Sequence, residues 1–234
     1  MKWRMPTADD SLHGKGKVMN APKVVLATRN AGKICELADS LRAFGLEVFG
    51  LEAFAGIEDV EETGVTFEEN ALLKACAVAR YTGCIAVADD SGVELDALGG
   101  APGVHSARYS DMRPLPPEAV DQALNKDERN NLVLLHELAS VPDAKRTGRF
   151  VCAMSVCKPD GSHITLRADW EGRILYAPRG KNGFGYDPLF FDPEVGRTAA
   201  ELNKEEKNAR SHRGKALRKL LAIWPEFYVG GCRS

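Results

Sequence analysis

The sequence lacks both a long hydrophobic run and an excess of charge of one sign. No stretch approaches the roughly 20 apolar residues that a membrane-spanning helix needs. The 31 basic and 33 acidic residues give a net charge of −2, whereas a general nucleic-acid binder usually carries a strongly basic excess. We therefore expect neither a membrane nor a nucleic acid as partner. A small anionic ligand remains compatible with this composition, because a few local cations are enough to hold one.

The six cysteines include no C-x-x-C pair, the spacing that is typical of many zinc sites and redox motifs. Most of them fall in apolar, periodic segments of the chain. We expect buried thiols in a reducing compartment, and neither disulfides nor zinc ligands, for Cys35, Cys76, Cys84, Cys152, Cys157 and Cys232.

Residues 1–22 contain no apolar run of the kind that a signal peptide requires. We interpret them as a disordered N-terminal tail, in which Met19 offers an alternative start, and we expect a cytoplasmic protein. With 234 residues the chain can bury a sizeable core without the help of a disulfide or a metal. We expect residues 23–234 to form a single α/β domain.

Strand-like and helix-like segments alternate along the first part of the chain. Residues 23–28 form a short β-branched run, and residues 34–44 place apolar side chains at helical spacing. Thr66 and Glu69 have the spacing of a capping box, which predicts the start of a second helix. A buried strand is expected at 85–88, and it ends on two carboxylates.

The second part of the chain adds a helical region between residues 114 and 139 and a predicted hairpin. Its strands, at 149–157 and 162–168, are joined by the tight-turn sequence Lys-Pro-Asp-Gly. Another strand-like run follows Trp170, and a helix over 214–224 closes the chain. This order predicts an α/β fold with a mixed central sheet flanked by helices.

The turn between the first strand and the first helix, ATRNAGK at residues 27–33, is a candidate phosphate site. Backbone N–H groups at a helix start, helped by a glycine and a lysine, form a cradle for phosphate. The turn is not a Walker A motif, because the first glycine of that motif is absent and Ile34 follows the lysine. A plain strand-to-helix turn without a ligand is the alternative interpretation.

Two adjacent carboxylates, Asp89 and Asp90, follow the strand at 85–88. Open α/β sheets usually bind ligands at the carboxyl ends of their strands, and two like charges this close favour a cation nearby. Mg²⁺ suits such a place, because it binds through a few carboxylates together with substrate phosphates. A solvated acidic turn is the alternative.

The segment EETG at 61–64 precedes a helix on which Asn70 and Lys74 stand four residues apart and hence on one face. Both are polar residues on an otherwise apolar helix. A buried Lys74 would need an anionic partner. Alternatively, its stem lies along the core and its charge reaches water at the rim. Both interpretations stay open on the sequence alone.

Two late segments, GFGYD at 183–187 and KNARSHRG at 207–214, combine an aromatic ring, a carboxylate and several cations. A ring flanked by glycines can offer a face on which a base stacks, and Asp187 could accept hydrogen bonds. We expect Ser211 to cap the last helix and to place His212 and Arg213 at its positive end, where the arginine fork suits a carbonyl or a phosphate. The alternative is a glycine turn followed by a polar helix start.

Five segments, in this order, resemble the motifs of the inosine/xanthosine triphosphate pyrophosphatases, a family that removes non-standard purine nucleotides. They are VVLATRNAGK, EETGVTFEENALLKA, ADDSGVELDALGGAPGVHSARYS, NGFGYDPLFF and TAAELNKEEKNARSHRGKAL. The resemblance extends from Lys23 to about Leu220. It implies a homodimer of elongated α/β subunits, each with its site in a cleft between two lobes. It also implies Mg²⁺-dependent hydrolysis of ITP, dITP and XTP to the monophosphate and pyrophosphate.

The resemblance further implies a role for each matching residue. Asp90 would be the catalytic acceptor and a metal ligand, Glu61 would join the metal site, and Ser91 would contact the substrate. The phosphates would be held by the loop residues Thr28, Arg29, Asn30, Ala31, Gly32 and Lys33. The nucleoside would be framed by Phe184, Gly185, Tyr186 and Asp187. The base would be read by Lys207, His212 and Arg213.

Two positions depart from the family pattern. Arg29 stands where the loop often has glycine, and it adds a cation to which the resemblance assigns no role. His105 stands in place of the usual tyrosine, which could alter a contact between the lobes or in the dimer. The N-terminal extension has no counterpart among the motifs.

Two other functions compete with this interpretation. The tetrapeptides NKDE at Asn125 and NKEE at Asn203 approach the guanine-binding pattern of GTPases. Each lacks the aspartate in the fourth place, and no Walker A motif is present, so we reject that class. A non-catalytic purine-nucleotide sensor could use the same pocket, but it would have no need for the carboxylate pair Glu61 and Asp90.

Overall fold

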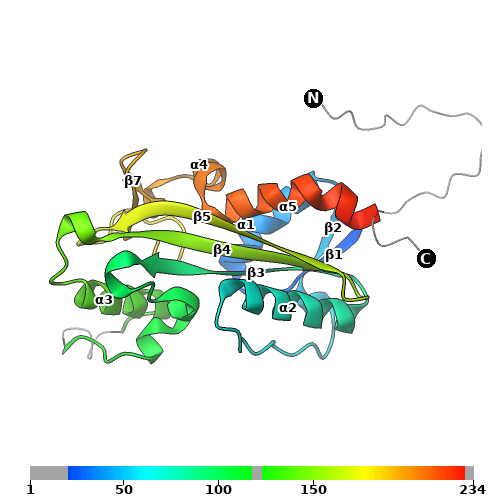
Figure 1. The fold of residues 1–234 in the computed structure, drawn as a ribbon, viewed down its shortest axis with the longest axis horizontal. Coiled ribbons are helices and arrows are strands. Elements are labelled where there is room, and N and C mark those ends of the chain that lie inside the picture. Colours follow the sequence, from blue (N-terminus) through cyan, green and yellow to red (C-terminus); the bar gives the residue numbers. More distant parts are fainter. Residues whose placement is uncertain (1–20, 118–122, 230–234) are drawn as a thin grey trace, which may run out of the picture.

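A mixed sheet of seven strands, in the order β2-β1-β3-β4-β5-β6-β7, forms the centre of the computed structural model (Figure 1). The structure describes residues 21–117 and 123–229, so the predicted tail lies outside the described residues except for residues 21 and 22. β1 is parallel to β2 and β3, and the other neighbours are antiparallel. The strands are β1 (Lys23–Leu26), β2 (Glu47–Phe49), β3 (Ile85–Leu95), β4 (Thr147–Cys157), β5 (His163–Ile174), β6 (Phe190–Asp192) and β7 (Arg197–Thr198).

Helices cover both faces of this sheet, which confirms the predicted α/β class (Figure 1). On one face lie α1 (Ala31–Ala43) and α5 (His212–Val229), and on the other lies α2 (Phe67–Thr82). The 3-10 segment η3 (Gly103–Asp111) and the helices α3 (Lys126–Glu137) and α4 (Lys204–Arg210) lie toward the other end of the long strands. No helix among the described residues is long and apolar enough to cross a membrane.

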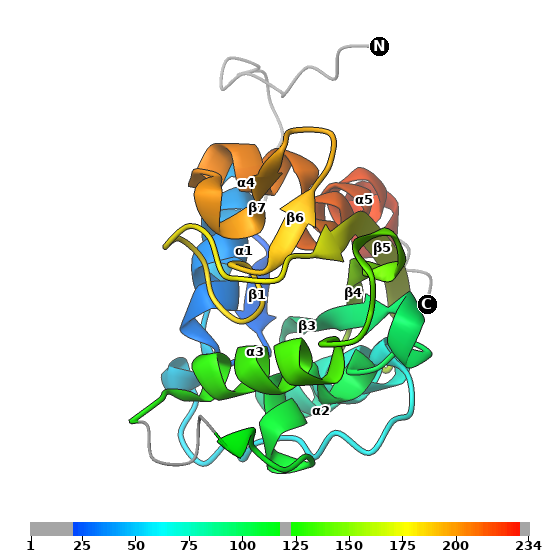
Figure 2. The ribbon, with the colours of Figure 1, turned by 90° about the vertical axis from the view of Figure 1, so that its left-hand side faces the viewer.

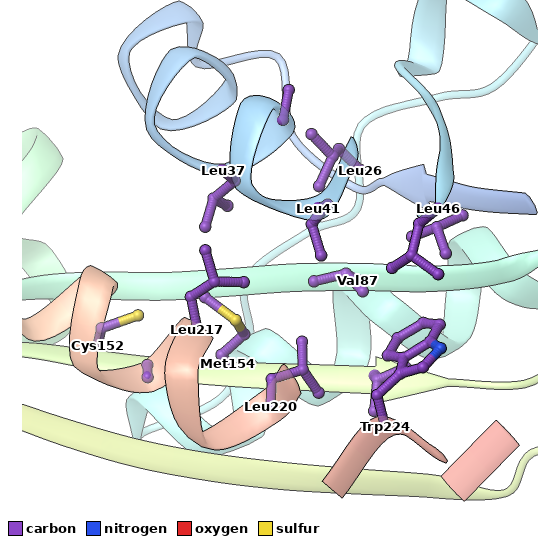
Figure 3. Close-up of a cluster of buried hydrophobic side chains, with 14 of the residues drawn as sticks. Leu26, Leu37, Leu41, Leu46, Val87, Cys152, Met154, Leu217, Leu220 and Trp224 are labelled. Carbon is purple, nitrogen blue, oxygen red and sulfur yellow. The ribbon is translucent and has the colours of Figure 1, made fainter. Parts of the chain in front are cut away.

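Two separate hydrophobic clusters divide the molecule into two lobes. In the first, Leu41 of α1 and Leu220 and Trp224 of α5 pack on Val87 and Met154 of the sheet (Figure 3). We call this end, with β1, β2, α1, α2 and α5, the α1 lobe. The second cluster joins η3, α3 and β6, and we call this end of the sheet, which also carries β7, the α3 lobe. Figure 2 looks along the sheet from that end, with α3 on one side and β6, β7 and α4 on the other.

Capping boxes start three of the helices. The box predicted at Thr66 and Glu69 is confirmed at the start of α2. Asn125 begins α3 in the same way, with Glu128 as the reciprocal partner, and Asn203 begins α4. The two tetrapeptides that approach a guanine-binding motif are therefore helix caps, in which the asparagine and a glutamate three residues later satisfy free backbone N–H groups.

Two strand boundaries differ from those expected. β3 does not end at Asp89 but continues to Leu95, because it remains paired with β4 along its whole length. Its other neighbour, β1, stops at Leu26 opposite Val87. The strand-like run after Trp170 is no separate strand, since β5 continues through it to Ile174.

The expectation of free, buried thiols was wrong for two cysteines. Cys76 of α2 and Cys157 at the end of β4 form a disulfide, with their Cα atoms 5.2 Å apart. The pair comes together because α2 packs across β4, which brings residues far apart in sequence to a distance that suits a bridge. Among the free thiols, Cys152 is buried as expected, whereas Cys35 is exposed and Cys84 is half-buried. Cys232 lies outside the described residues.

Arg146 is almost completely buried, at 1% exposure, and holds the junction between α3, β4 and β5. Its guanidinium donates to the carbonyls of Leu138 at 2.7 Å, Ile174 at 2.9 Å and Leu175 at 3.0 Å. It also lies 4.2 Å from the centre of the Tyr176 ring. No pattern in the sequence indicates this arrangement.

Replacing Arg146 should cost stability rather than activity. Arg146→Met keeps an apolar stem but leaves three carbonyls without their donor, so we expect the free energy of unfolding to fall by about 3 kcal/mol. Urea denaturation should show a lower midpoint at an unchanged slope. Lys145→Met, at the exposed neighbouring position, is the control, and equal midpoints for the two variants would contradict the role given to Arg146.

Candidate active site

The segments that the sequence singled out meet around one cavity of about 490 Å³ between the two lobes. This volume is within the range of small-molecule sites. Most of the predicted residues line it, whereas Ala31, Gly32 and Glu61 do not. The predicted residues that line the cavity are Thr28, Arg29, Asn30, Lys33, Asp90, Ser91, Phe184, Gly185, Tyr186, Asp187, Lys207, His212 and Arg213.

The end of β1 at Leu26 determines where the cavity lies. On the side away from β4, the stretch of β3 that carries Asp89 to Ser91 has no strand partner among the described residues. The chain instead turns into α1, where the Asn30 side chain caps the helix by accepting from the backbone N–H of Lys33 at 3.1 Å. The N-terminus of α1 and an open edge of β3 therefore face the same space.

Asp89 is buried and surrounded by cations. Its carboxylate lies 3.2 Å from Nζ of Lys33 and 3.2 Å from Nε of Arg213, and it accepts a hydrogen bond from Ser91 at 3.0 Å. Burial raises the pKa of Asp89, but Lys33, Arg213 and Lys74 outweigh it and hold that pKa well below its usual range. Asp89 is therefore ionised, and its partners are residues of the protein.

Asp90 faces the cavity and lies among the residues of α2. Its two carboxylate oxygens accept from Nδ2 of Asn70 and from Nζ of Lys74, each at 3.2 Å. Burial raises the pKa of Asp90, an effect that Lys74 and Lys33 only partly offset and that Glu62 reinforces. The pKa values of the two neighbouring aspartates thus shift in opposite directions. Successive residues of a strand point to opposite faces, so the two carboxylates lie near different charges.

Lys74 bridges two carboxylates, which confirms the interpretation of a buried lysine with an anionic partner. Its side chain is 13% exposed, and Nζ lies 2.8 Å from Glu62 and 3.2 Å from Asp90. Burial lowers the pKa of Lys74, but Asp90, Asp89 and Glu62 outweigh it and raise the pKa. Asn70 serves the same region by accepting from the backbone N–H of Gly64 at 2.8 Å.

The structure brings Glu62, and not the predicted Glu61, to the carboxylate of Asp90. Glu61 is exposed and does not line the cavity. Glu62 does line it, because Lys74 and Arg108 hold its carboxylate at 2.8 and 3.1 Å. The EETG motif located the segment correctly, but two adjacent glutamates look alike until a partner distinguishes them.

A second group of charges lies where the helices α1, α4 and α5 approach the loop 183–187. Lys207 donates to Asp187 at 2.6 Å and to Glu36 at 2.9 Å, and Arg213 also pairs with Glu36. The ring of Phe184 lies 5.1 Å from Nζ of Lys207 and 5.6 Å from the Arg213 guanidinium. Sequence reasoning missed Glu36, although an acidic residue between the apolar Ile34 and Leu37 was an available signal.

His212 is a buried, neutral imidazole at the start of α5. Burial, Arg213 and Lys207 lower the pKa of His212 well below its usual value. The ring stacks on Phe150 with centres 4.8 Å apart, and Nδ1 has no hydrogen-bond partner. Ser211 caps the helix as predicted, since its hydroxyl accepts from the N–H of Gly214 at 3.1 Å.

Arg29, the first of the two departures from the family pattern, reaches across to the acidic loop before α2. Nε lies 2.8 Å from Asp59, and Nη2 donates to the carbonyl of Ile57 at 2.9 Å. The pair is exposed, so it contributes little to stability. Arg29 thus ties together two loops that line the cavity. The other departure, His105, has a buried Nδ1 without a partner and does not line the cavity.

The described residues contain no cluster of three or more His, Cys, Asp or Glu side chains arranged to hold a metal ion. Two carboxylates do converge, those of Glu62 and Asp90, with the ammonium of Lys74 between them. Their oxygens face the cavity that Lys33 also lines. The arrangement suits a cation that takes part of its ligands from something else in the cavity.

Comparisons with known proteins find similar chains. The profile of the Ham1 family matches residues 24–223. A relative from Nitratidesulfovibrio vulgaris, named dITP/XTP pyrophosphatase, is 60% identical over 91% of this chain and 100% of its own. A HAM1 protein of known structure from Coxiella burnetii is 39% identical with a TM-score of 0.75, covering 88% of this chain and 99% of its own. A nucleoside-triphosphatase / dITP/XTP pyrophosphatase from Mycobacterium abscessus is 43% identical with a TM-score of 0.67, covering 85% and 98%.

Proposed function

Because the chain belongs to the Ham1 family, we propose that it hydrolyses ITP, dITP and XTP to the monophosphate and pyrophosphate, and so keeps these nucleotides out of DNA and RNA. The match confirms the enzyme class that the motifs predict, a nucleoside-triphosphate pyrophosphatase. The observation that carries the substrate class is a single cavity that joins the phosphate loop, the pair Glu62 and Asp90, and the ring and cations around Phe184.

We propose Mg²⁺ as the cofactor, with Glu62 and Asp90 in the places where the motifs suggested Glu61 and Asp90. The donor set fits, because this small ion is usually bound by one or two carboxylates and completes its shell with water and phosphate oxygens. The pair already accepts one cation, the ammonium of Lys74. When bound, the ion would polarise the phosphate and neutralise charge that develops during its transfer.

The chain's own residues would position the reactants. Lys33 and the N–H groups at the start of α1 would hold the phosphates. Asp90, whose raised pKa makes it a better proton acceptor than an ordinary aspartate, would orient and deprotonate the attacking water. Attack at the α-phosphorus, expected from the family, breaks its bond to the bridging oxygen and releases pyrophosphate. Asn70 and Lys74 would keep Asp90 aimed at the water.

The group around Phe184 would bind the base. Hypoxanthine and xanthine carry an acceptor oxygen at position 6, where adenine carries an amino donor. Hydrogen-bond donors from Lys207, from Arg213 or from the single N–H of the neutral His212 ring would favour the oxygen. A site built to donate to an oxygen can strongly reject a base that presents an amino group there. Three directions of the Arg213 fork already reach Asp89, Glu36 and Ser91. We therefore assign Arg213 a positioning role as well.

The simplest test mixes the purified protein with ITP and Mg²⁺ and measures pyrophosphate. Release of pyrophosphate and IMP in equal amounts is expected. Binding of ITP without any product would favour the non-catalytic sensor, which would use the same cavity. We further propose that the protein acts as a homodimer in the cytoplasm, with its substrate as the only nucleotide partner.

Lys33 should act on the phosphates and not on the base. Lys33→Ala should lower kcat/KM for ITP and for XTP by similar factors of about ten- to a hundredfold, the range of a lost charged hydrogen bond. Steady-state kinetics with both nucleotides would measure this. Lys145→Ala, an exposed lysine outside the cavity, is the control. A loss confined to one nucleotide would place Lys33 at the base instead.

A further inference from the structure

Two residues of α3 hold both backbone groups of one glycine in the loop 183–187. The carboxylate of Asp127 accepts from the N–H of Gly185 at 2.7 Å. The side-chain amide of Asn131 donates to the carbonyl of Gly185 at 3.0 Å. Asp127 and Asn131 are four residues apart, so they lie on the same face of the helix. One turn of α3 thus fixes the loop at a single residue.

Neither contact is needed for α3 itself. The helix start is already satisfied by the box of Asn125 and Glu128. The adjacent Asn130 bonds in another direction, accepting from the N–H of Ser110 at 2.8 Å. Asp127 and Asn131 reach out of the helix to the loop, and their hydrogen bonds stabilise the loop conformation rather than the helix.

The glycine that they hold follows Phe184 directly, so its position sets that of the aromatic ring. Gly185 has a φ of +60°, a left-handed conformation that favours glycine. On its other side, the N–H of Phe184 donates to Asp187 at 2.8 Å. The ring also packs against the start of α1, where a Cβ added to Gly32 would lie 2.6 Å from it. Little freedom is left to the ring once Gly185 is fixed.

We propose that Asp127 and Asn131 are positioning residues for the nucleobase, which act by holding Gly185 and thereby the plane of the Phe184 ring. The inference rests on the proposed function in one respect, that Phe184 is the face on which the base stacks. It assigns to α3, which carries none of the family motifs, a share in base binding. The residues proposed above to hold the phosphates, Lys33 and the start of α1, belong to another element, so phosphate binding should not depend on the two hydrogen bonds to Gly185, which we call the clamp.

Two probes separate these parts of the site: inosine monophosphate carries the base, and inorganic pyrophosphate does not. Asn131→Ala should weaken binding of inosine monophosphate about fivefold, the factor of one ordinary hydrogen bond, and Asp127→Ala, which removes a charged acceptor, about tenfold or more. Binding of pyrophosphate should change less than twofold. Asp127→Asn should recover most of the affinity, because its amide oxygen still accepts from Gly185. His136→Ala, an exposed change on the same helix, is the control.

Isothermal titration calorimetry would measure these affinities, and a double-variant cycle would locate the effect. In a Phe184→Ala background, Asn131→Ala should weaken binding of inosine monophosphate by less than about twofold, because the ring that the clamp positions is gone. If Asn131→Ala does not fold, Asn131→Leu removes the same donor at nearly the same size without adding a charge, and should give the same fivefold loss.

Several results would overturn the inference. Equally weakened binding of both probes would mean that the two residues have a general structural role. An undiminished effect of Asn131→Ala in the Phe184→Ala background would mean that Asn131 does not act through the Phe184 ring. Failure of the wild type to bind inosine monophosphate would remove the base site altogether. Failure of the wild type to hydrolyse ITP would instead contradict the proposed function, while the two binding probes would still decide on the clamp.

Discussion

Asp90→Asn is expected to lower turnover of ITP by about a hundredfold or more while the protein remains folded. The substitution removes the negative charge that would orient and deprotonate water and bind the metal, and losses of this size are common for such groups. The fold should survive, because asparagine has nearly the same shape and its oxygen can still accept from Asn70 or Lys74, both 3.2 Å away in the native protein.

Steady-state kinetics in saturating Mg²⁺ would measure the loss, and thermal unfolding would check the fold. Glu226→Gln, an exposed carboxylate on α5 outside the cavity, controls for the change of one charge. Near-native turnover by Asp90→Asn would show that the mechanism proposed here is wrong.

Arg213→Ala is expected to have the second large effect, on stability as well as on activity. The variant leaves the carboxylates of Asp89 and Glu36 buried without their shared cation. Breaking a buried pair by removing one partner typically costs 3–5 kcal/mol, so we expect the free energy of unfolding to fall by about 3 kcal/mol. Activity on ITP should fall strongly as well, because Asp89 and Ser91 would no longer be held in place.

The remaining activity would show which edge of the base Arg213 serves. The ITP-to-ATP ratio of kcat/KM should narrow, whereas the ITP-to-GTP ratio should change much less, since guanine shares the oxygen at position 6. Arg213→Lys is the matched control: it keeps one charge but cannot reach all three partners, so stability should fall by a smaller amount. If only the ITP-to-GTP ratio of kcat/KM fell, Arg213 would instead contact position 2 of the base.

Much of the fold follows from the sequence because its local signals agree. The capping box at Thr66, the hairpin turn and the apolar periodicities each predicted an element that the structure contains. The wrong end for β3 has a physical cause. Two aspartates follow the apolar run and so predict the end of the strand, yet the antiparallel partner β4 continues beside them. The residues between 85 and 95 do not themselves indicate that a strand distant in sequence pairs with them.

The site was predictable in its segments and less so in its contacts. The motifs located segments that meet around one cavity: the loop at 28–33, the aspartate pair and the late cations. They did not separate Glu62 from Glu61, because that distinction depends on Lys74 and Arg108. They also did not reveal the bond between Cys76 and Cys157, which depends on how α2 lies across β4. Partners that come from distant segments are the part that a single sequence leaves open.

The three long strands have a mechanical consequence for the cavity. β3, β4 and β5 contain 11, 11 and 12 residues, a span of about 36–40 Å, and each passes from one lobe into the other without a break. The lobes are thus joined by a continuous, hydrogen-bonded sheet and not by a flexible linker. Opening the cleft would require these three strands to twist. The hydrogen bonds between them resist such a deformation far more than a loop would. Nucleotide binding should therefore depend on cavity residues that are already in position before the nucleotide arrives. The conformational entropy of ordering these residues is lost during folding and not during binding.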